Sequence, residues 1–89
     1  NHGYCDLFLM PDLLHYEVNH SYIIELKYLS EKDSDAKAET QWEEAVAQIR
    51  EYAAAPKVRQ FVQNTKLHCI VVQFRTWELQ RMEEIPIDL

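Results

Sequence analysis

Glycine and proline are scarce in this sequence, which contains one glycine and three prolines among its 89 residues. Both residues are enriched in flexible linkers and low-complexity segments, so their scarcity excludes a chain that is largely disordered. Hydrophobic residues make up 47% and charged residues 27% of the sequence, which is typical of a globular protein. Because a chain of 89 residues is long enough for one domain and too short for two, we expect a single domain over residues 1–89.

The sequence also lacks a long apolar run and a leader segment. A membrane-spanning helix needs roughly 18 consecutive apolar residues, and no run approaches that length. No charged and then apolar leader precedes a cleavage site. The two cysteines, Cys5 and Cys69, lie in apolar strand-like segments, where reduced core thiols are the ordinary interpretation. We therefore expect a cytoplasmic protein without a membrane segment.

An excess of positive charge is missing as well, since the formal net charge is −6 at pH 7. Non-specific affinity for nucleic acids comes mostly from Lys and Arg contacts with phosphate, so this balance counts against a broad basic surface for DNA or RNA. The negative charge does not exclude a nuclease. Carboxylates that bind divalent cations add negative charge to the sequence, and the bound metal ion offsets that charge.

Apolar runs and polar segments divide the first two thirds of the chain. Residues 4–10 and 21–28 are apolar and rich in aromatic or β-branched side chains, which predicts two strands. A polar loop then leads to a helix cap at Ser34 or Asp35. The helix is expected over residues 36–54, with one apolar stripe at spacings of three and four: Trp42, Ala45, Val46, Ile49 and Ala53.

Pro56 either ends this helix or opens a short second one. Residues 67–74 then predict a buried strand, and residues 77–85 a more exposed edge strand. The first two strands suit an antiparallel hairpin, and the helix that follows permits parallel pairing of the second and third strands. We therefore expect an α/β fold in the order strand, strand, helix, strand, strand, with a mixed sheet. The run 21–28 is apolar enough for a sheet covered on both faces.

The chain begins at Asn1 rather than at methionine and enters its first strand almost at once. We interpret it as a fragment that lacks N-terminal elements of a larger fold. A sheet that begins in this way exposes an unpaired edge, which makes a homodimer formed by edge-strand pairing a candidate assembly.

Two charges, Glu25 and Lys27, interrupt the apolar strand at 21–28. Because side chains alternate along a strand, both project to the same face. Burying a carboxylate and an ammonium costs several kcal/mol per ion unless the two are paired or hold a metal. The ordinary alternative is an edge strand whose charges face water.

Three short patterns occur in order: Gly3-x-x-Asp6, apolar-Glu25-x-Lys27, and Gln48-x-x-x-Tyr52 on the predicted helix. The set resembles the PD-(D/E)XK nuclease superfamily, whose signature is an acidic residue on one strand and Glu-x-Lys on the next. Gln-x-x-x-Tyr resembles an element of the exonuclease branch of that superfamily.

The likeness is greatest to the nuclease-like domain that follows AAA-type ATPase modules in bacterial proteins. It implies a restriction-endonuclease-like mixed sheet flanked by a helix. Glu-x-Lys alone is a weak signal, whereas the ordered set is moderately specific.

Two aspartates compete for the first position of the signature. Pro11-Asp12 spells the literal PD, whereas Asp6 matches the family's strand pattern, and Asp12 sits just beyond the expected strand end. A turn near His15-Tyr16 would place Asp6 opposite Glu25, and a tight turn at Asn19-His20 would place Asp12 opposite Lys27. We favour Asp6.

The resemblance implies hydrolysis of phosphodiester bonds in DNA with the help of Mg²⁺ or Mn²⁺, which prefer oxygen ligands. The ligands would be Asp6, Glu25 and the backbone carbonyl of Leu26. Lys27 would orient the attacking water or stabilise developing charge. Gln48 and Tyr52, one helical turn apart, would orient the site or the nucleic-acid backbone, although Tyr52 is also an ordinary packing residue.

Two other functions stay open: a nuclease-like domain that binds without cutting, and an unrelated interaction domain.

The four histidines lack metal-ligand spacing and are interpreted as ordinary surface or strand residues. Trp42 and Trp77 are expected to pack in the core and at the sheet edge.

Overall fold

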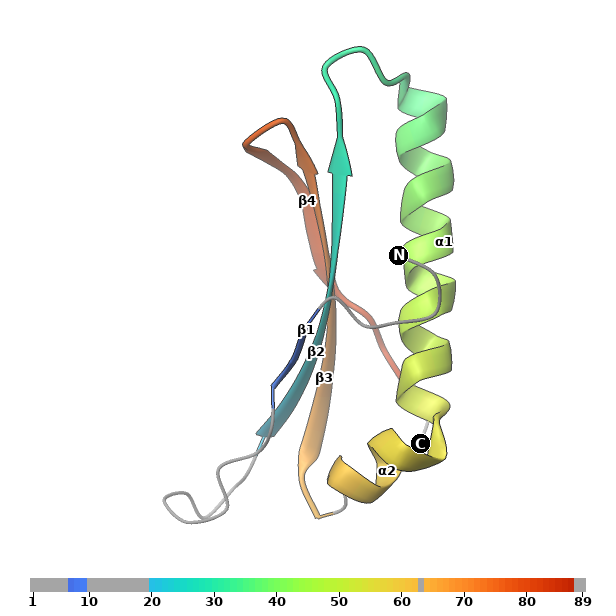
Figure 1. Cartoon of the computed structure of the whole chain (residues 1–89), viewed down its shortest axis with the longest axis vertical. Helices are drawn as coiled ribbons and strands as arrows, with labels where there is room; N and C mark the ends of the chain where they lie inside the picture. The colour runs from blue at the N-terminus through green and yellow to red at the C-terminus, as the bar shows by residue number, and fades with distance from the viewer. Residues whose placement is uncertain (1–6, 10–19, 63, 88–89) are drawn as a thin grey trace.

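The computed structural model describes residues 7–9, 20–62 and 64–87. Within these ranges the chain forms one mixed sheet with two helices on one side of it (Figure 1). The elements follow in the order β1 (Leu7–Leu9), β2 (His20–Leu29), α1 (Asp35–Ala54), α2 (Pro56–Val62), β3 (Lys66–Arg75) and β4 (Glu78–Glu84). The predicted α/β order is confirmed, and Pro56 opens a short second helix. Residues 4–6 and 10 of the predicted first strand lie outside the described ranges.

The sheet has the strand order β1-β2-β3-β4. β1 and β2 are antiparallel, β2 and β3 are parallel, and β3 and β4 are antiparallel. The parallel pair is the consequence of the crossover through α1 and α2, which returns the chain to the same end of the sheet. Both the hairpin and the parallel pairing were predicted.

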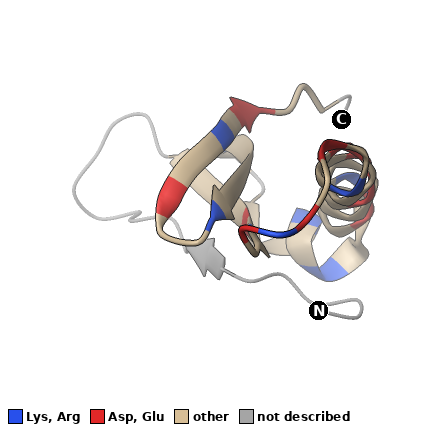
Figure 2. Cartoon of the chain, turned by 90° about the horizontal axis from the view of Figure 1, so that it is seen from above, with Lys and Arg blue, Asp and Glu red and all other residues tan. Residues whose placement is uncertain are grey.

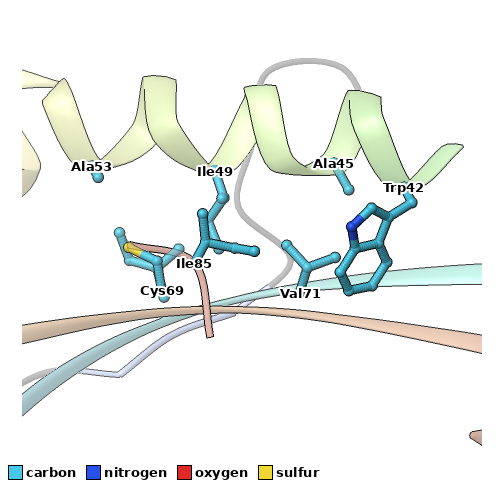
Figure 3. Close-up of a cluster of buried hydrophobic side chains, with 8 residues drawn as sticks. Trp42, Ala45, Ile49, Ala53, Cys69, Val71 and Ile85 are labelled. Carbon is cyan, nitrogen blue, oxygen red and sulfur yellow. The ribbon is translucent and has the colours of Figure 1, made fainter. Parts of the chain in front are cut away.

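The core lies between α1 and the sheet (Figure 3). The helix contributes the predicted apolar stripe, since Trp42, Ala45, Ile49 and Ala53 are buried, and Val46 packs at its border. The sheet contributes residues that alternate along β2 and β3, together with one that follows β4: Ile23, Cys69, Val71 and Ile85. This packing fixes the helix-facing side of β2 and β3.

The start of α1 is capped by a side chain. Ser34 has an extended backbone, and its hydroxyl oxygen accepts a hydrogen bond from the backbone N–H of Lys37 at 3.1 Å. This satisfies one of the amide groups that the first helical turn leaves without a partner in the helix. Of the two predicted cap positions, Ser34 is the one observed.

The opposite face of the sheet is not covered by a described helix. Tyr28, Leu79 and Met82 keep 62%, 55% and 59% of their surface exposed, and Tyr28 stacks on Phe74 with ring centroids 5.6 Å apart. Within the described ranges, the expectation of a sheet covered on both faces is therefore wrong. The apolar character of β2 arises from its central position between β1 and β3.

Trp77 differs from its prediction. It lies in the turn between β3 and β4 and is 92% exposed, so the expected packing at the sheet edge is wrong. β4 itself is largely exposed, as predicted. None of the helices in the described ranges has the length and apolar character needed to cross a membrane.

Candidate functional site

Glu25 and Lys27 lie on the helix-facing side of β2. Glu25 is completely buried, and its Oε1 lies 3.9 Å from Nζ of Lys27, whose side chain is 17% exposed. β2 is a central strand, so the alternative of an edge strand with both charges facing water is wrong. The sequence places a carboxylate inside the domain and an ammonium at the boundary between core and solvent.

A buried glutamine stands beside this pair. In the parallel register Glu25 is paired with Val71, and Lys27 with Gln73. Gln73 is 2% exposed, and its Nε2 donates hydrogen bonds to the backbone oxygen of Ala38 at 3.0 Å and to Oε1 of Gln41 at 2.9 Å. These bonds connect β3 with the first half of α1 next to Lys27.

The sequence motifs did not identify Gln73 or Gln41 as neighbours of the candidate site. The available signal is a glutamine inside an otherwise apolar strand, the same signal that identified Glu25 and Lys27. Gln41 also donates from Nε2 to the backbone oxygen of Tyr28 at 3.1 Å, which ties α1 to β2. The polar side chains next to Lys27 are thus held by hydrogen bonds to two strands and a helix.

Gln48 and Tyr52 lie in the second half of α1, which packs on β2 and β3. Both side chains are half-buried, and Tyr52 packs against the core cluster. They stand one turn apart on the border of the apolar stripe, as their spacing predicted. Packing therefore accounts for part of the burial of Tyr52.

The two competing aspartates, Asp6 and Asp12, lie outside the described residues. The described pairs of the first hairpin are Leu7 with Ile24, Phe8 with Ile23, and Leu9 with Tyr22. This is the register that the sequence connects with Asp6, rather than the shifted register needed for Asp12. Leu26, whose carbonyl is the third expected ligand, is paired with Val72 in the centre of the sheet.

A hard divalent cation in a protein needs several oxygen donors gathered at one place. Among residues 7–9, 20–62 and 64–87, no group of three or more His, Cys, Asp and Glu side chains is arranged to hold a metal. Glu25 alone supplies a described carboxylate at this position. Carboxylate and carbonyl oxygens are nevertheless the donors that Mg²⁺ and Mn²⁺ prefer, so the residue types of the expected set fit such an ion.

The outer surface of α1 is acidic. Glu39, Glu43, Glu44 and Glu51 are all exposed on this helix, and Figure 2, which looks down the helix, shows acidic and basic residues on it. Such a surface repels phosphate, because affinity for nucleic-acid backbones comes from cations. Exposed acids outnumber the exposed bases Lys37 and Arg50 on α1, so its outer side does not favour contact with a phosphate backbone.

Comparison with known proteins gives one match. The sequence model of the PD-(D/E)XK nuclease superfamily matches residues 1–84, which include β1 to β4 and both helices. Neither a curated protein nor a solved structure matches the chain. The match covers nearly the whole sequence, and the mixed sheet with its helices is compatible with part of that superfamily's fold. The chain belongs to the PD-(D/E)XK nuclease superfamily.

Proposed function

We propose that this chain is a metal-dependent nuclease domain that hydrolyses phosphodiester bonds in DNA, with Asp6, Glu25 and Lys27 as its catalytic residues. The observation that carries the proposal is the buried carboxylate of Glu25 with the Lys27 ammonium 3.9 Å away on the same face of a central strand. Membership of a nuclease superfamily supports the same activity. A buried carboxylate beside a partly exposed ammonium is costly, which favours a role other than stability.

The register of the first hairpin supports Asp6 as the second carboxylate. Leu7 is paired with Ile24 and Phe8 with Ile23, so each step back along β1 corresponds to one step forward along β2. Continued by one residue, this register would pair Asp6 with Glu25. Partners directly opposite in an antiparallel pair share a face, which is the arrangement that two ligands of one ion require.

Asp6, Glu25 and the backbone carbonyl of Leu26 would hold Mg²⁺ or Mn²⁺. A divalent ion bound there supplies Lewis acid chemistry, lowering the pKa of a bound water and neutralising charge on the phosphate. Glu25 contributes a carboxylate that is shielded from water, so its interaction with a cation is weakened little by solvent.

Lys27 would orient the attacking water or stabilise the charge that develops on the phosphate oxygens. Its side chain is only partly exposed, so the ammonium is accessible to a substrate and is still fixed by its neighbours. Gln48 and Tyr52 would orient the site or the DNA backbone from α1. Because the outer surface of α1 is acidic, the substrate would approach on the side of Lys27 and not across that surface.

We further propose that residues 1–89 form one nuclease-like domain, which in a longer protein follows an AAA-type ATPase module and acts in the bacterial cytoplasm. The resemblance of the ordered motifs supports this context. An ATPase module would supply the cationic surface for DNA that a chain of net charge −6 lacks.

The second candidate function is a nuclease-fold domain that binds a partner and does not cut. The observation that favours it is the acidic character of the chain, with net charge −6 and exposed glutamates along α1. In such a domain the nuclease fold is retained, and Glu25 and Lys27 have a structural role without catalysis.

A cleavage assay separates the two. The purified chain would be incubated with Mg²⁺ or Mn²⁺ and linear, circular or single-stranded DNA, together with the variants Glu25→Gln and Lys27→Met. We expect each variant to lose about 100-fold or more in rate, since a preorganised charge at the reacting phosphate contributes on that scale. Glu44→Gln, which changes an exposed acid on α1, is the matched control and should cut as the wild type does.

Circular dichroism would establish that both variants are folded. Cleavage that persists at the wild-type rate in folded Glu25→Gln and Lys27→Met would rule out the assigned site. A folded wild-type chain that leaves all three DNA forms intact in both metals would favour the binding domain.

A further inference from the structure

A second group of chemically active side chains lies on the face of the sheet opposite Glu25 and Lys27. Nδ1 of His20, in β2, lies 2.8 Å from Nε2 of His68, in β3. Nδ1 of His68 lies 3.0 Å from Oε2 of Glu84, at the end of β4. We call these three residues the His20–His68–Glu84 cluster.

The register of the sheet explains why these histidines meet. His20 is paired with Lys66 and Tyr22 with His68, so the two histidines are diagonal neighbours on one face of β2 and β3. Ser21 and Ile23, which alternate with them along β2, are buried and face the helix. The cluster therefore lies on the uncovered face. Its two histidines are 48 positions apart in the sequence, so they show no ligand spacing there.

The cluster orients a lone pair of His68. With Nδ1–H of His68 donating to the Glu84 carboxylate, Nε2 of His68 is the unprotonated nitrogen of the ring. A carboxylate in this position is the arrangement that metal-binding histidines commonly have, because it fixes the tautomer and raises the basicity of the ligating nitrogen. Tyr22 stacks on the His68 ring with centroids 4.9 Å apart, which restrains the ring plane.

We propose that His20 and His68 bind a divalent transition-metal ion of the Ni²⁺ or Cu²⁺ class, with Glu84 as the positioning residue. Nitrogens 2.8 Å apart, each about 2.0–2.1 Å from one ion, define an angle of roughly 90° at the metal. That is the angle between neighbouring ligands in square-planar or octahedral coordination, which Cu²⁺ and Ni²⁺ adopt.

Binding requires one tautomeric change and a turn of both rings, because the head-on contact, with ring centroids 5.0 Å apart, points the two nitrogens at each other. The proton that His20 places on Nδ1 in its hydrogen bond to His68 moves, by exchange with water, to Nε2 of the same ring, so that Nδ1 offers a lone pair to the ion. No net proton is released from the protein, and water completes the coordination, because the cluster supplies two protein nitrogens. His20 is exposed, so an ion has direct access from solvent.

Calorimetric titration of the chain with Ni²⁺ in excess Mg²⁺ tests the proposal. Mg²⁺ binds oxygen ligands and leaves imidazole free, so it occupies any carboxylate site without competing for the histidines. We expect one Ni²⁺ per chain, at least tenfold weaker binding in His20→Gln and in His68→Gln, and about tenfold weaker binding in Glu84→Gln.

Matched controls identify the site. Glu25→Gln, and His2→Gln and His15→Gln, which remove the chain's other two histidines, should bind Ni²⁺ as the wild type does. Nitrogen NMR of the imidazole rings should show Nδ1 of His20 and Nε2 of His68 as the nitrogens that change, which does not depend on any variant being folded. The proposal is overturned if the wild type takes up no Ni²⁺, or if His20→Gln and His68→Gln bind it unchanged. Unchanged binding in Glu84→Gln alone would overturn the positioning role of that carboxylate.

Discussion

Trp42 makes the largest side-chain contribution of α1 to the core. It is 5% exposed, and the guanidinium carbon of Arg81 lies 4.1 Å from its ring centroid. Arg81 in turn donates to Oε2 of Glu83 at 2.7 Å and to Oε2 of Glu39 at 3.3 Å. Trp42 thus joins the helix to the core of the sheet and, through a cation over its ring, to the exposed edge strand β4.

We expect Trp42→Ala to reduce the free energy of unfolding by about 3–5 kcal/mol, the cost of truncating a large buried aromatic residue. Small domains are stable by about 5–15 kcal/mol, so this loss is a large part of the total. Urea denaturation followed by circular dichroism measures it. Trp42→Phe, which keeps a ring for Arg81, should lose clearly less. A shift for Trp42→Ala no larger than that of the surface variant Glu44→Gln would contradict the assigned role.

Helical spacing predicted the buried residues of α1 well, because one face of an isolated helix is determined by its own sequence. The period of a strand likewise predicted that Glu25 and Lys27 share a face. Gln73 and the meeting of His20 with His68 could not be predicted. Both depend on the register between β3 and β2. That register is set by two segments far apart in the sequence, so neither segment predicts it alone.

The start of α1 is also connected to the strands through the loop that precedes it. Nη1 of Arg75 donates hydrogen bonds to the backbone oxygens of Ser30 at 2.9 Å and Asp33 at 2.7 Å. The Asp33 carboxylate accepts from the backbone N–H of Ser30 and from Nζ of Lys37, both at 2.8 Å. These bonds fix the path from the end of β2 into the helix.

The hydrogen bond from Lys37, followed by the one from the Ser30 backbone, lowers the pKa of Asp33 below its ordinary value of 3.8. A carboxyl group whose pKa is lower in the folded state stabilises the fold above its ordinary pKa, and this contribution is lost as the pH falls through the lowered pKa. Asp33→Asn should therefore lower the thermal unfolding midpoint at pH 7 by a small amount, and the difference from the wild type should disappear in acid.

Thermal unfolding at neutral pH and at a pH well below 3.8 measures this difference. Glu44→Gln, on the exposed side of α1, controls for the loss of one negative charge. A difference between Asp33→Asn and the wild type that is the same at both pH values would contradict the role of the ionised carboxylate.

Element order and strand direction could be predicted because they follow from hydrophobic pattern and crossover geometry. The turn between β3 and β4 could not. Thr76 adopts a φ of 54°, a conformation that glycine or asparagine usually supplies in such turns, and Trp77 beside it points into solvent. Nothing in these residue types identifies a turn.

At the scale of the whole molecule, the two faces of the sheet differ in the side chains that they carry. The face toward α1 holds the core and the Glu25–Lys27 pair, and the other face carries exposed apolar residues and the His20–His68–Glu84 cluster. A homodimer formed by edge-strand pairing stays a prediction. β4, one edge of the described sheet, carries exposed charges that discourage such pairing, which favours β1 as the pairing edge.

The candidate nuclease site could be predicted only in part, because one of its residues depends on how two strands pair. The motifs singled out Glu25 and Lys27 from the sequence, and the structure buries Glu25 inside the domain and leaves Lys27 at the boundary with solvent. The choice between Asp6 and Asp12 depends on hairpin register, which a sequence leaves open when the connection between two strands is long. The described pairs end at Leu7, so the assignment of Asp6 stays a proposal.

The thermal stability of the chain as Mn²⁺ is added is the measurement that tests the metal site most directly. Wild type and Glu44→Gln should be stabilised by about 2.7 kcal/mol when Mn²⁺ reaches a hundred times its Kd. Asp6→Asn and Glu25→Gln should show no such stabilisation. An equal response to Mn²⁺ in all four proteins would contradict the account, because the ion would then bind elsewhere.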